Sequence, residues 1–98
     1  MSWKVFWTTE AEDTFTDNVF YLEREWNQTV IENFIRKTEE IIATISLNPK
    51  VFPLVNKRKT IHKSLVVKQI SLYYRVVENR IELITFWNNY QNPKKLKL

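Results

Sequence analysis

The sequence contains no glycine, no cysteine and only one histidine among its 98 residues. Phosphate-binding loops of the Walker and dinucleotide-binding kinds need glycine, because their backbone approaches the ligand closely and adopts positive φ angles. Without cysteine, neither disulfides, thiolate metal sites nor cysteine nucleophiles can form. The single His62 cannot form a histidine-pair zinc site, and no nucleophile-elbow motif supports a serine triad. We therefore expect no metal site and no cofactor.

Long hydrophobic runs are missing as well. No apolar segment approaches the ~20 residues needed to cross a bilayer, and Met1–Lys4 does not resemble a signal peptide. Together with the lack of cysteine, this predicts a cytoplasmic protein that does not interact with membranes. The hydrophobic fraction of 44% and the aromatic fraction of 14% suit one compact domain spanning residues 1–98.

Positive charge is in moderate excess. Fifteen Lys and Arg residues against eleven Asp and Glu residues give a net charge of +4 and a pI near 9.4. Such a balance favours a polyanionic or acidic protein partner, although a soluble domain can also be basic without one.

The first half of the chain has the pattern of one strand and two helices. Alternation over residues 3–7 predicts a short strand, and Thr9 to Glu12 fits a capping box that begins a helix. That helix runs to about residue 25, with an apolar stripe at Ala11, Phe15, Val19, Leu22 and Trp26. Asn27 can cap a second helix, which stops at Asn48 because Pro49 follows. Its stripe comprises Ile31, Phe34, Thr38, Ile41 and Ile45.

The second half predicts strands. Residues 50–57 contain Pro53 and are typical of a loop, and the following β-branched and aromatic segments predict strands at 59–67, 70–77 and 81–87. The fold class is therefore α+β: an N-terminal strand, an antiparallel two-helix hairpin and three antiparallel strands in one sheet. The expected helix layer and the sheet residues below it (or their opposite-parity neighbours) are Phe15, Val19, Leu22, Phe34, Ile41 and Ile45 over Val5, Leu72, Tyr74, Leu83 and Thr85.

Basic and aromatic residues accumulate in the second half. Lys and Arg neutralise phosphates while aromatic faces stack on bases, so this set could bind single-stranded RNA. Scattered cations on a solvated face and strand aromatics in a core are the alternative, and a solitary His62 is most simply a surface or core filler. The candidate RNA-binding residues are Arg58, Lys59, Lys63, Tyr73, Trp87, Lys94 and Lys95.

Arg75 has two possible roles. If Leu72 and Tyr74 face the helices, Arg75 lies on the open face of the sheet beside Tyr73. There it could form a rigid anion site, or it could pair with Glu82 across the hairpin. The sequence leaves both open.

Several segments resemble the RelE/ParE superfamily of toxins, often called plasmid stabilisation proteins. The resemblance covers nearly the whole chain and rests on the element order, the Asn48-Pro49 helix exit and three segments. These are Leu72-Tyr73-Tyr74-Arg75-Val76-Val77, Ile81-Glu82-Leu83-Ile84 and Phe86-Trp87-Asn88-Asn89-Tyr90-Gln91-Asn92-Pro93. The Y-R-V strand followed at this distance by F-W and a proline is the most distinctive part.

The resemblance implies a bacterial type II toxin that a cognate antitoxin holds silent. RelE-like relatives cleave messenger RNA in the ribosomal decoding site without a metal, whereas ParE-like relatives poison DNA gyrase and are not nucleases. The basic sheet face favours RNA cleavage, and the long helices favour the ParE-like class. A catalytically silent member that binds its antitoxin and regulates their operon is a third alternative.

The resemblance also implies a candidate catalytic set of Arg75, Lys68 and Tyr90. Arg75 matches the strand arginine of the RelE-like toxins, and Lys68 falls near their basic position on the preceding strand. The ending departs from the pattern F-W-D-x-R-x-x-P, because Asn88 stands at the acidic position and Tyr90 at the arginine. A tyrosine could stack on a base or donate a proton, but it cannot offset phosphate charge.

Overall fold

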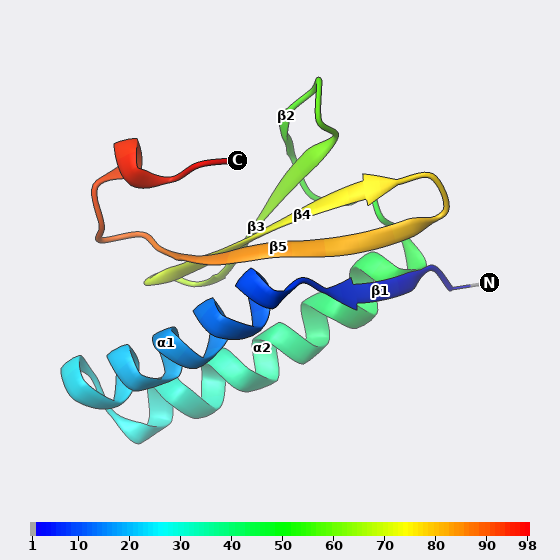
Figure 1. The fold of residues 1–98 in the computed structure, drawn as a ribbon. Helices are drawn as coiled ribbons and strands as arrows, with labels where there is room; N and C mark the ends of the chain where they lie inside the picture. Colours follow the sequence, from blue (N-terminus) through cyan, green and yellow to red (C-terminus); the bar gives the residue numbers. More distant parts are fainter. Residues whose placement is uncertain (1) are drawn as a thin grey trace.

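A computed structural model describes residues 2–98 as a helical hairpin against one five-stranded sheet (Figure 1). The two helices are α1 (Thr9–Glu25) and α2 (Gln28–Leu47), and the C-terminal segment, residues 89–98, contains the short 3-10 helix η1 (Pro93–Lys95). The strands are β1 (Lys4–Trp7), β2 (Leu54–Asn56), β3 (Ile61–Val67), β4 (Ile70–Val77) and β5 (Arg80–Asn88).

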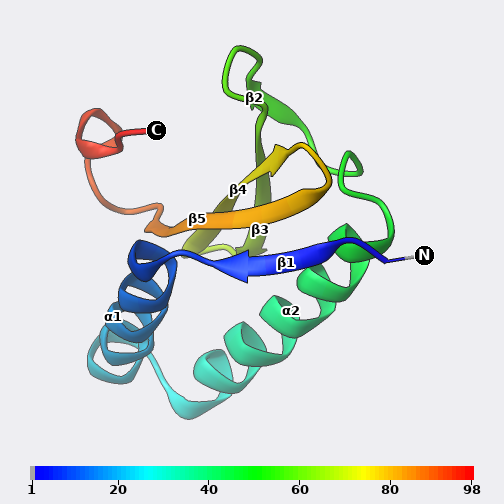
Figure 2. The same cartoon turned by 45° about the vertical axis from the view of Figure 1, so that its right-hand side comes forward.

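The sheet places the first and last strands side by side. Its order is β1-β5-β4-β3-β2, with β1 parallel to β5 and every other neighbouring pair antiparallel. Figure 2 shows the helices joined by a tight turn, from which they diverge along one side of the sheet. The strands β1 and β2 are therefore the two edges of the sheet, and neither α1 nor α2 covers the opposite face.

This architecture confirms the expected α+β class and the order of its main elements. The helices begin and end within about a residue of the expected positions, and β4 has the expected bounds. The strand β2 was missed, because Pro53 made residues 50–57 typical of a loop. It is only three residues long, and its register with β3 is irregular, so it carries little periodic signal.

Side-chain caps fix both helix starts. Asn27 Oδ1 accepts a hydrogen bond from the Val30 N–H at 3.1 Å, as expected. The cap of α1 is Thr8 rather than Thr9, so the expected capping box is shifted by one residue. Thr8 Oγ1 accepts from the Ala11 N–H at 3.0 Å and donates to the Leu83 carbonyl at 2.8 Å. The choice of Thr8 thus depends on its contact with β5, which the local sequence does not reveal.

The core between the helices and the sheet agrees largely with the expected one. Leu22, Phe34 and Ile45 are fully buried, and their cluster contains Leu72, Tyr74 and Leu83. The expectation for the end of β5 was wrong at one position, because Phe86 rather than Thr85 joins this cluster.

A β-bulge explains that difference. Tyr73 pairs with Thr85 and Tyr74 pairs with Leu83, so Ile84 is an extra residue in β5. One extra residue reverses the alternation of side chains beyond it, which turns Phe86 toward the helices and Thr85 away from them.

The apolar stripe of α1 also differs from the expected one. Leu22 is fully buried, but Phe15 and Val19 are only partly buried, and Trp26 remains 36% exposed at the end of the helix. Asn18 is buried instead. A polar residue at that position is explained by what it contacts on β5.

The far end of β5 depends on α1 for its backbone hydrogen bonds. β1 ends at Trp7, opposite Leu83, so the following residues of β5 have no strand on that side. Thr14 Oγ1 accepts from the Phe86 N–H at 2.9 Å, and Asn18 Nδ2 donates to the Phe86 carbonyl at 2.8 Å. These two side chains replace a neighbouring strand, since buried backbone groups need partners.

Two further findings concern residues 2–98. None of the helices there combines the length and the apolar character that a membrane crossing requires. The same residues contain no cluster of three or more His, Asp or Glu side chains suited to holding a metal ion.

Candidate functional site

Arg75 lies on the face of the sheet that α1 and α2 leave open, and it is paired with Glu82. Its Nη2 donates to Glu82 Oε1 at 2.5 Å, while Arg80 donates to Glu82 Oε2 through Nη2 at 3.0 Å and Nε at 3.1 Å. The Glu82 side chain is 17% exposed, whereas those of Arg75 and Arg80 are 43% and 40% exposed. Of the two roles left open by the sequence, the structure therefore shows the ion pair.

The two arginines change the electrostatics of this position. Hydrogen bonds from Arg75 and then Arg80 lower the pKa of Glu82, so its carboxylate stays ionised near neutral pH. A carboxylate with a lowered pKa is a weak general base. The Arg75 charge is in turn partly offset, which reduces its ability to stabilise a phosphorane-like transition state.

Lys68 and Tyr90 lie together, at the other end of β4. They meet Trp26 of the turn between the helices: the Lys68 ammonium is 5.2 Å from the centroid of one Trp26 ring, and the Tyr90 ring stacks at 6.4 Å with an interplanar angle of 17°. Trp26 Nε1 donates to the Tyr21 hydroxyl at 3.3 Å. With Tyr90 58% exposed, these residues form a solvent-facing group of aromatic rings and one cation.

The three candidate catalytic residues are thus not gathered at one place. Lys68 precedes β4, and Arg75 lies five residues beyond Ile70, roughly 17 Å along the strand at ~3.3 Å per residue. Transition-state stabilisation by hydrogen bonding requires donors within about 3 Å of the reacting oxygen. In this arrangement Arg75 cannot reach a phosphate held between Lys68 and Tyr90.

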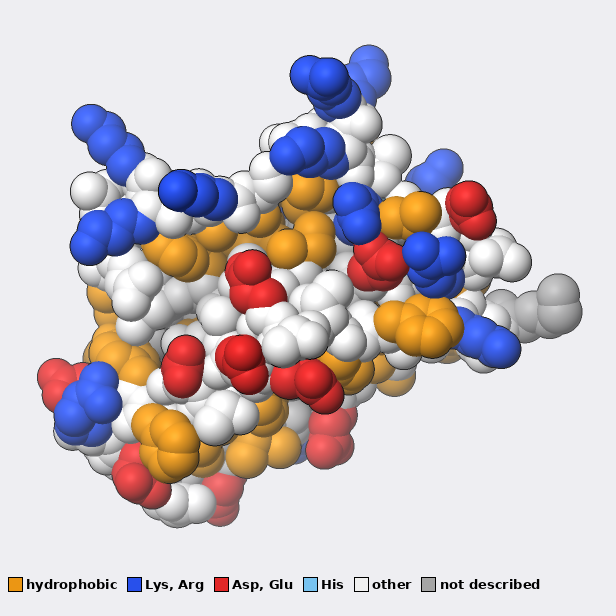
Figure 3. Space-filling model, in the orientation of Figure 1, with side chains coloured by type: hydrophobic (Ala, Val, Ile, Leu, Met, Phe, Trp, Pro, Cys, Tyr) orange, Lys and Arg blue, Asp and Glu red, His pale blue; other side chains and the backbone are white. Residues whose placement is uncertain are grey.

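The candidate RNA-binding residues are dispersed over several elements. Tyr73 is buried, with the Lys63 ammonium 5.8 Å from its ring centroid. In Figure 3, Lys and Arg side chains gather over the C-terminal segment and the β2–β3 turn, whereas Asp and Glu gather over α1. Arg58 and Lys59 belong to that turn, Lys94 and Lys95 to η1, and Trp87 to a cleft described next.

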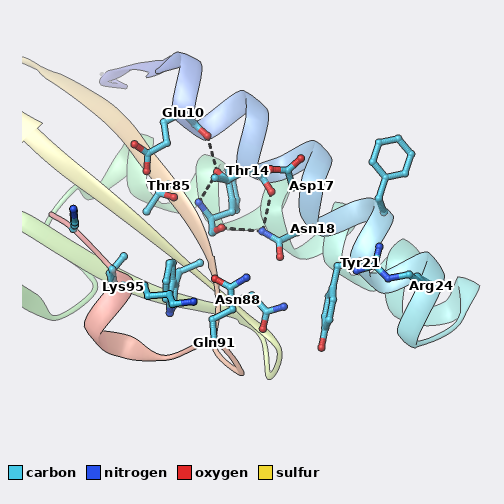
Figure 4. A pocket seen from close by; sticks show the side chains of 15 residues that line it. Glu10, Thr14, Asp17, Asn18, Tyr21, Arg24, Thr85, Asn88, Gln91 and Lys95 are labelled. Atoms are coloured by element: carbon cyan, nitrogen blue, oxygen red, sulfur yellow. Dashed lines mark hydrogen bonds between the residues drawn. The ribbon is translucent and has the colours of Figure 1, made fainter.

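A cleft of about 610 Å³ separates these two charged regions. Its lining residues come from α1, the end of β5 and the C-terminal segment, as Figure 4 shows for Asp17, Asn88 and Lys95. The sequence analysis did not predict this cleft, whose lining includes Glu10 and Asp17 of α1. The acidic residues of α1 could have indicated such a cleft, but the sequence does not show that the basic C-terminal segment faces them.

A second cavity, of about 450 Å³, lies at the opposite end of the sheet beside His62. The His62 ring is stacked on Tyr74 with centroids 5.2 Å apart, and its Nδ1 lies 2.8 Å from the Phe52 carbonyl oxygen. Burial raises the pKa of Tyr74 to about 12, against a smaller opposite effect of the Phe52 backbone, and its hydroxyl donates to the Pro49 carbonyl. His62 is therefore a core residue that also lines a cavity.

Comparison with known proteins identifies the fold. No protein-family model and no curated protein sequence matches the chain. Among solved structures, the chromosomal ParDE toxin–antitoxin system of P. aeruginosa contains a chain that superposes with a TM-score of 0.69 at 10% identity, covering 89% of this chain and 96% of that one. The fold is that of ParE- and YoeB-type toxins.

Two further structures share this fold over nearly their full length. The YoeB/ParE toxin of Agrobacterium tumefaciens superposes with a TM-score of 0.61 at 18% identity, covering 89% of this chain and 99% of that one. The YoeB dimer of Staphylococcus aureus also gives 0.61, at 14% identity, covering 92% and 100%. The fold that the sequence resemblance implied is therefore confirmed.

Proposed function

We propose that this chain is the toxin of a type II toxin–antitoxin pair and acts in the cytoplasm while a cognate antitoxin controls it. The observation that carries the proposal is the shared fold over nine-tenths of this chain and almost all of three toxin chains. Another Staphylococcus aureus structure with this fold is a YoeB–YefM complex. The basic surface suits an acidic partner, whose approach it would accelerate.

For the target, we propose DNA gyrase, the alternative that the sequence favoured less. The preference for RNA cleavage rested on the basic sheet face, and the resemblance implied Arg75, Lys68 and Tyr90 as its catalytic set. Arg75 is paired with Glu82 and lies roughly 17 Å along β4 from the turn that carries Lys68. An inhibitor that binds gyrase needs no assembled set of catalytic groups, so the dispersal of these residues supports it.

RNA cleavage is the second candidate, and one observation favours it. Lys68, Trp26 and Tyr90 combine a cation with two partly exposed aromatic rings. Such groups bind single-stranded RNA by stacking and by charge. A metal-independent endoribonuclease would then have to use Tyr90 as its proton donor and Lys68 for phosphate charge.

A growth experiment separates the toxin from a silent antitoxin-binding member, and one target from the other. The chain is induced in a bacterial host, and growth, ribosome-dependent transcript cleavage and gyrase-trapped DNA breaks are measured in the same culture. We expect growth arrest with trapped DNA breaks and intact transcripts, and relief when a cognate antitoxin is co-expressed. Unimpaired growth of cells that accumulate folded protein contradicts the toxin proposal.

Two variants test the catalytic residues directly. For gyrase inhibition, Arg75→Ala and Tyr90→Phe are expected to remain as toxic as the parent, because neither performs chemistry. For RNA cleavage, loss of one transition-state donor costs about 10²–10³ in rate. Ribosome-dependent cleavage that falls by this factor in Tyr90→Phe, in a protein with an unchanged melting temperature, favours the nuclease instead.

A further inference from the structure

The His62 ring has a fixed hydrogen-bonding pattern. Its Nδ1 lies 2.8 Å from the carbonyl oxygen of Phe52, which can only accept, so Nδ1 carries a proton. Stacking on Tyr74 holds the ring plane, and only 5% of the residue is exposed. No side chain or backbone group of residues 2–98 hydrogen-bonds Nε2. In the neutral ring this atom is an acceptor that can take a donor from outside the chain.

The cavity beside His62 is built from four separate parts of the chain. Trp3 precedes β1, Lys50 follows α2, Lys57 and Thr60 lie in the β2–β3 turn, and Glu78 lies in the β4–β5 turn. The apolar side chains of Leu54 and Val76 complete the wall that also contains the Trp3 indole.

Two non-glycine residues among residues 2–98 have a positive φ angle, and both line this cavity. Thr60 has a φ of 53° and Glu78 a φ of 54°, and neither is a glycine. For a β-branched residue such as Thr60 this conformation is a genuine outlier, and such backbone strain concentrates at functional sites. The strained turn at Thr60 is a further feature of this cavity, whereas the positive φ of Glu78 is what the tight β4–β5 hairpin turn requires.

The charges of the cavity specify the chemistry of its occupant. Lys50 and Lys57 outweigh Glu78 at the rim, and both lysines are exposed. His62 also lines the cavity, with its Nδ1 turned to the Phe52 carbonyl so that Nε2 is the ring atom left to accept, and Leu54 and Val76 make part of the wall apolar. The complementary ligand carries a carboxylate for the lysines, an N–H donor for His62 and an apolar side chain for Trp3 and Leu54. A polypeptide segment that contains both acidic and apolar residues has all three groups.

The adjacent edge of the sheet favours an extended peptide. β2 has β3 on one side and no strand on the other among residues 2–98. Leu54 and Val55 are 46% and 47% exposed, so this edge is both unpaired and apolar. Extended segments bind such edges through main-chain hydrogen bonds while their side chains enter neighbouring pockets.

We propose that the cavity beside His62 binds an acidic, extended segment of a partner protein, with a carboxylate between Lys50 and Lys57 and a backbone N–H donating to His62 Nε2. The inference rests on the proposed function only in taking this partner to be the antitoxin. The binding itself requires neither toxicity nor a particular target.

A titration followed by NMR tests the site, because the chain has one histidine and therefore one imidazole signal set. Histidine and tryptophan labelled with ¹⁵N are incorporated, the indole signal missing in Trp3→Phe is assigned to Trp3, and the full chain is titrated with the peptide acetyl-Leu-Glu-Leu-Asp-Leu-amide. We expect a protonated Nδ1 before addition and saturable shifts of the His62 Nε2 and the Trp3 indole. The same peptide with Gln in place of Glu and Asn in place of Asp is expected to bind at least about tenfold more weakly. A neutral ring protonated at Nε2 overturns the proposal, as does a titration without saturation.

Matched variants and a second ligand test whether the carboxylate of the bound segment lies between Lys50 and Lys57. Lys50→Gln with Lys57→Gln should weaken acidic-peptide binding roughly tenfold, whereas Lys37→Gln with Lys94→Gln, which changes net charge equally elsewhere, should leave it unchanged. Equal losses in both double variants show nonspecific attraction and overturn the site. Inorganic phosphate is the other probe, and binding as tight as that of the peptide overturns the peptide assignment.

The same double variant distinguishes this inference from the proposed function. If the chain is a toxin, Lys50→Gln with Lys57→Gln stays toxic in the growth experiment but is neutralised less well by the antitoxin. If the parent chain proves harmless, the toxin proposal fails, but the peptide titration still tests whether the cavity beside His62 binds an acidic segment. Normal neutralisation of a toxic double variant contradicts the assignment of the segment to the antitoxin.

Discussion

The two faces of the sheet are stabilised by different kinds of interaction. The helix-covered face holds Leu72 and Leu83, which form one fully buried cluster with Phe34 of α2, whereas the other face holds the Arg75–Glu82–Arg80 ion-pair network with its arginines about two-fifths exposed. Burial of large apolar side chains contributes several kcal/mol each, while partly exposed ion pairs contribute about 0–1 kcal/mol. Changes to this ion-pair network should therefore alter surface chemistry with little effect on the fold.

The largest effect is expected on the covered face. Phe34 is fully buried, with its ring 4.9 Å from that of Phe15 and 5.9 Å from that of Phe86. Phe34→Ala should lower the free energy of unfolding by about 3–5 kcal/mol, through lost burial and a cavity. Urea unfolding measures it, with Phe20→Ala as the control because Phe20 is 58% exposed. Similar losses in both variants would remove the distinction between the covered core and the solvent-facing helix surface.

An intermediate effect is expected where α1 meets the edge of β5. Thr14→Val keeps the side-chain shape but removes the acceptor of the Phe86 N–H. The unfolding free energy should fall by about 1–3 kcal/mol, the cost of an unpaired backbone donor. Thr16→Val is the matched control, since Thr16 Oγ1 bonds only to the Glu12 carbonyl at an exposed position. Amide hydrogen exchange at Phe86 that is unchanged in Thr14→Val would show that this bond does not protect the strand.

The smallest effect is expected on the open face, and it depends on pH. The pKa of Glu82 lies below its ordinary value of 4.5 in the folded chain, so its stabilisation is present above that value and disappears as pH falls through the lowered pKa. Glu82→Gln should cost less than about 1 kcal/mol at pH 7, and the difference from the parent should shrink on acidification.

Unfolding at pH 7 and at about pH 3 checks this expectation. Glu40→Gln, which breaks the more exposed pair with Arg36, provides the comparison and should cost less. If Glu82→Gln lowers the free energy of unfolding as much as Phe34→Ala does, the open face stabilises the fold as strongly as the covered face.

Local patterns were sufficient for most elements. The stripe and the Asn27 cap predicted α2, the strand pattern predicted β4 within its bounds, and the order of elements predicted the α+β class. These features depend on residues within a few positions of each other, where periodicity and capping act directly. How the candidate site residues are arranged could not be predicted in this way, because it depends on partners far away in the sequence.

By itself, the sequence determined which segments become helices and strands, which face of each is apolar, and which residue types are available for chemistry. Only the tertiary structure decided how those segments meet. The bulge at Ile84 directs Phe86 into the core, and the pairing of β4 with β5 places Arg75 beside Glu82. The packing of the helices against the sheet places Trp26 next to Lys68 and Tyr90. Periodicity fixes the side of an element on which a residue lies, but strand register and the packing of helices against strands select its partner.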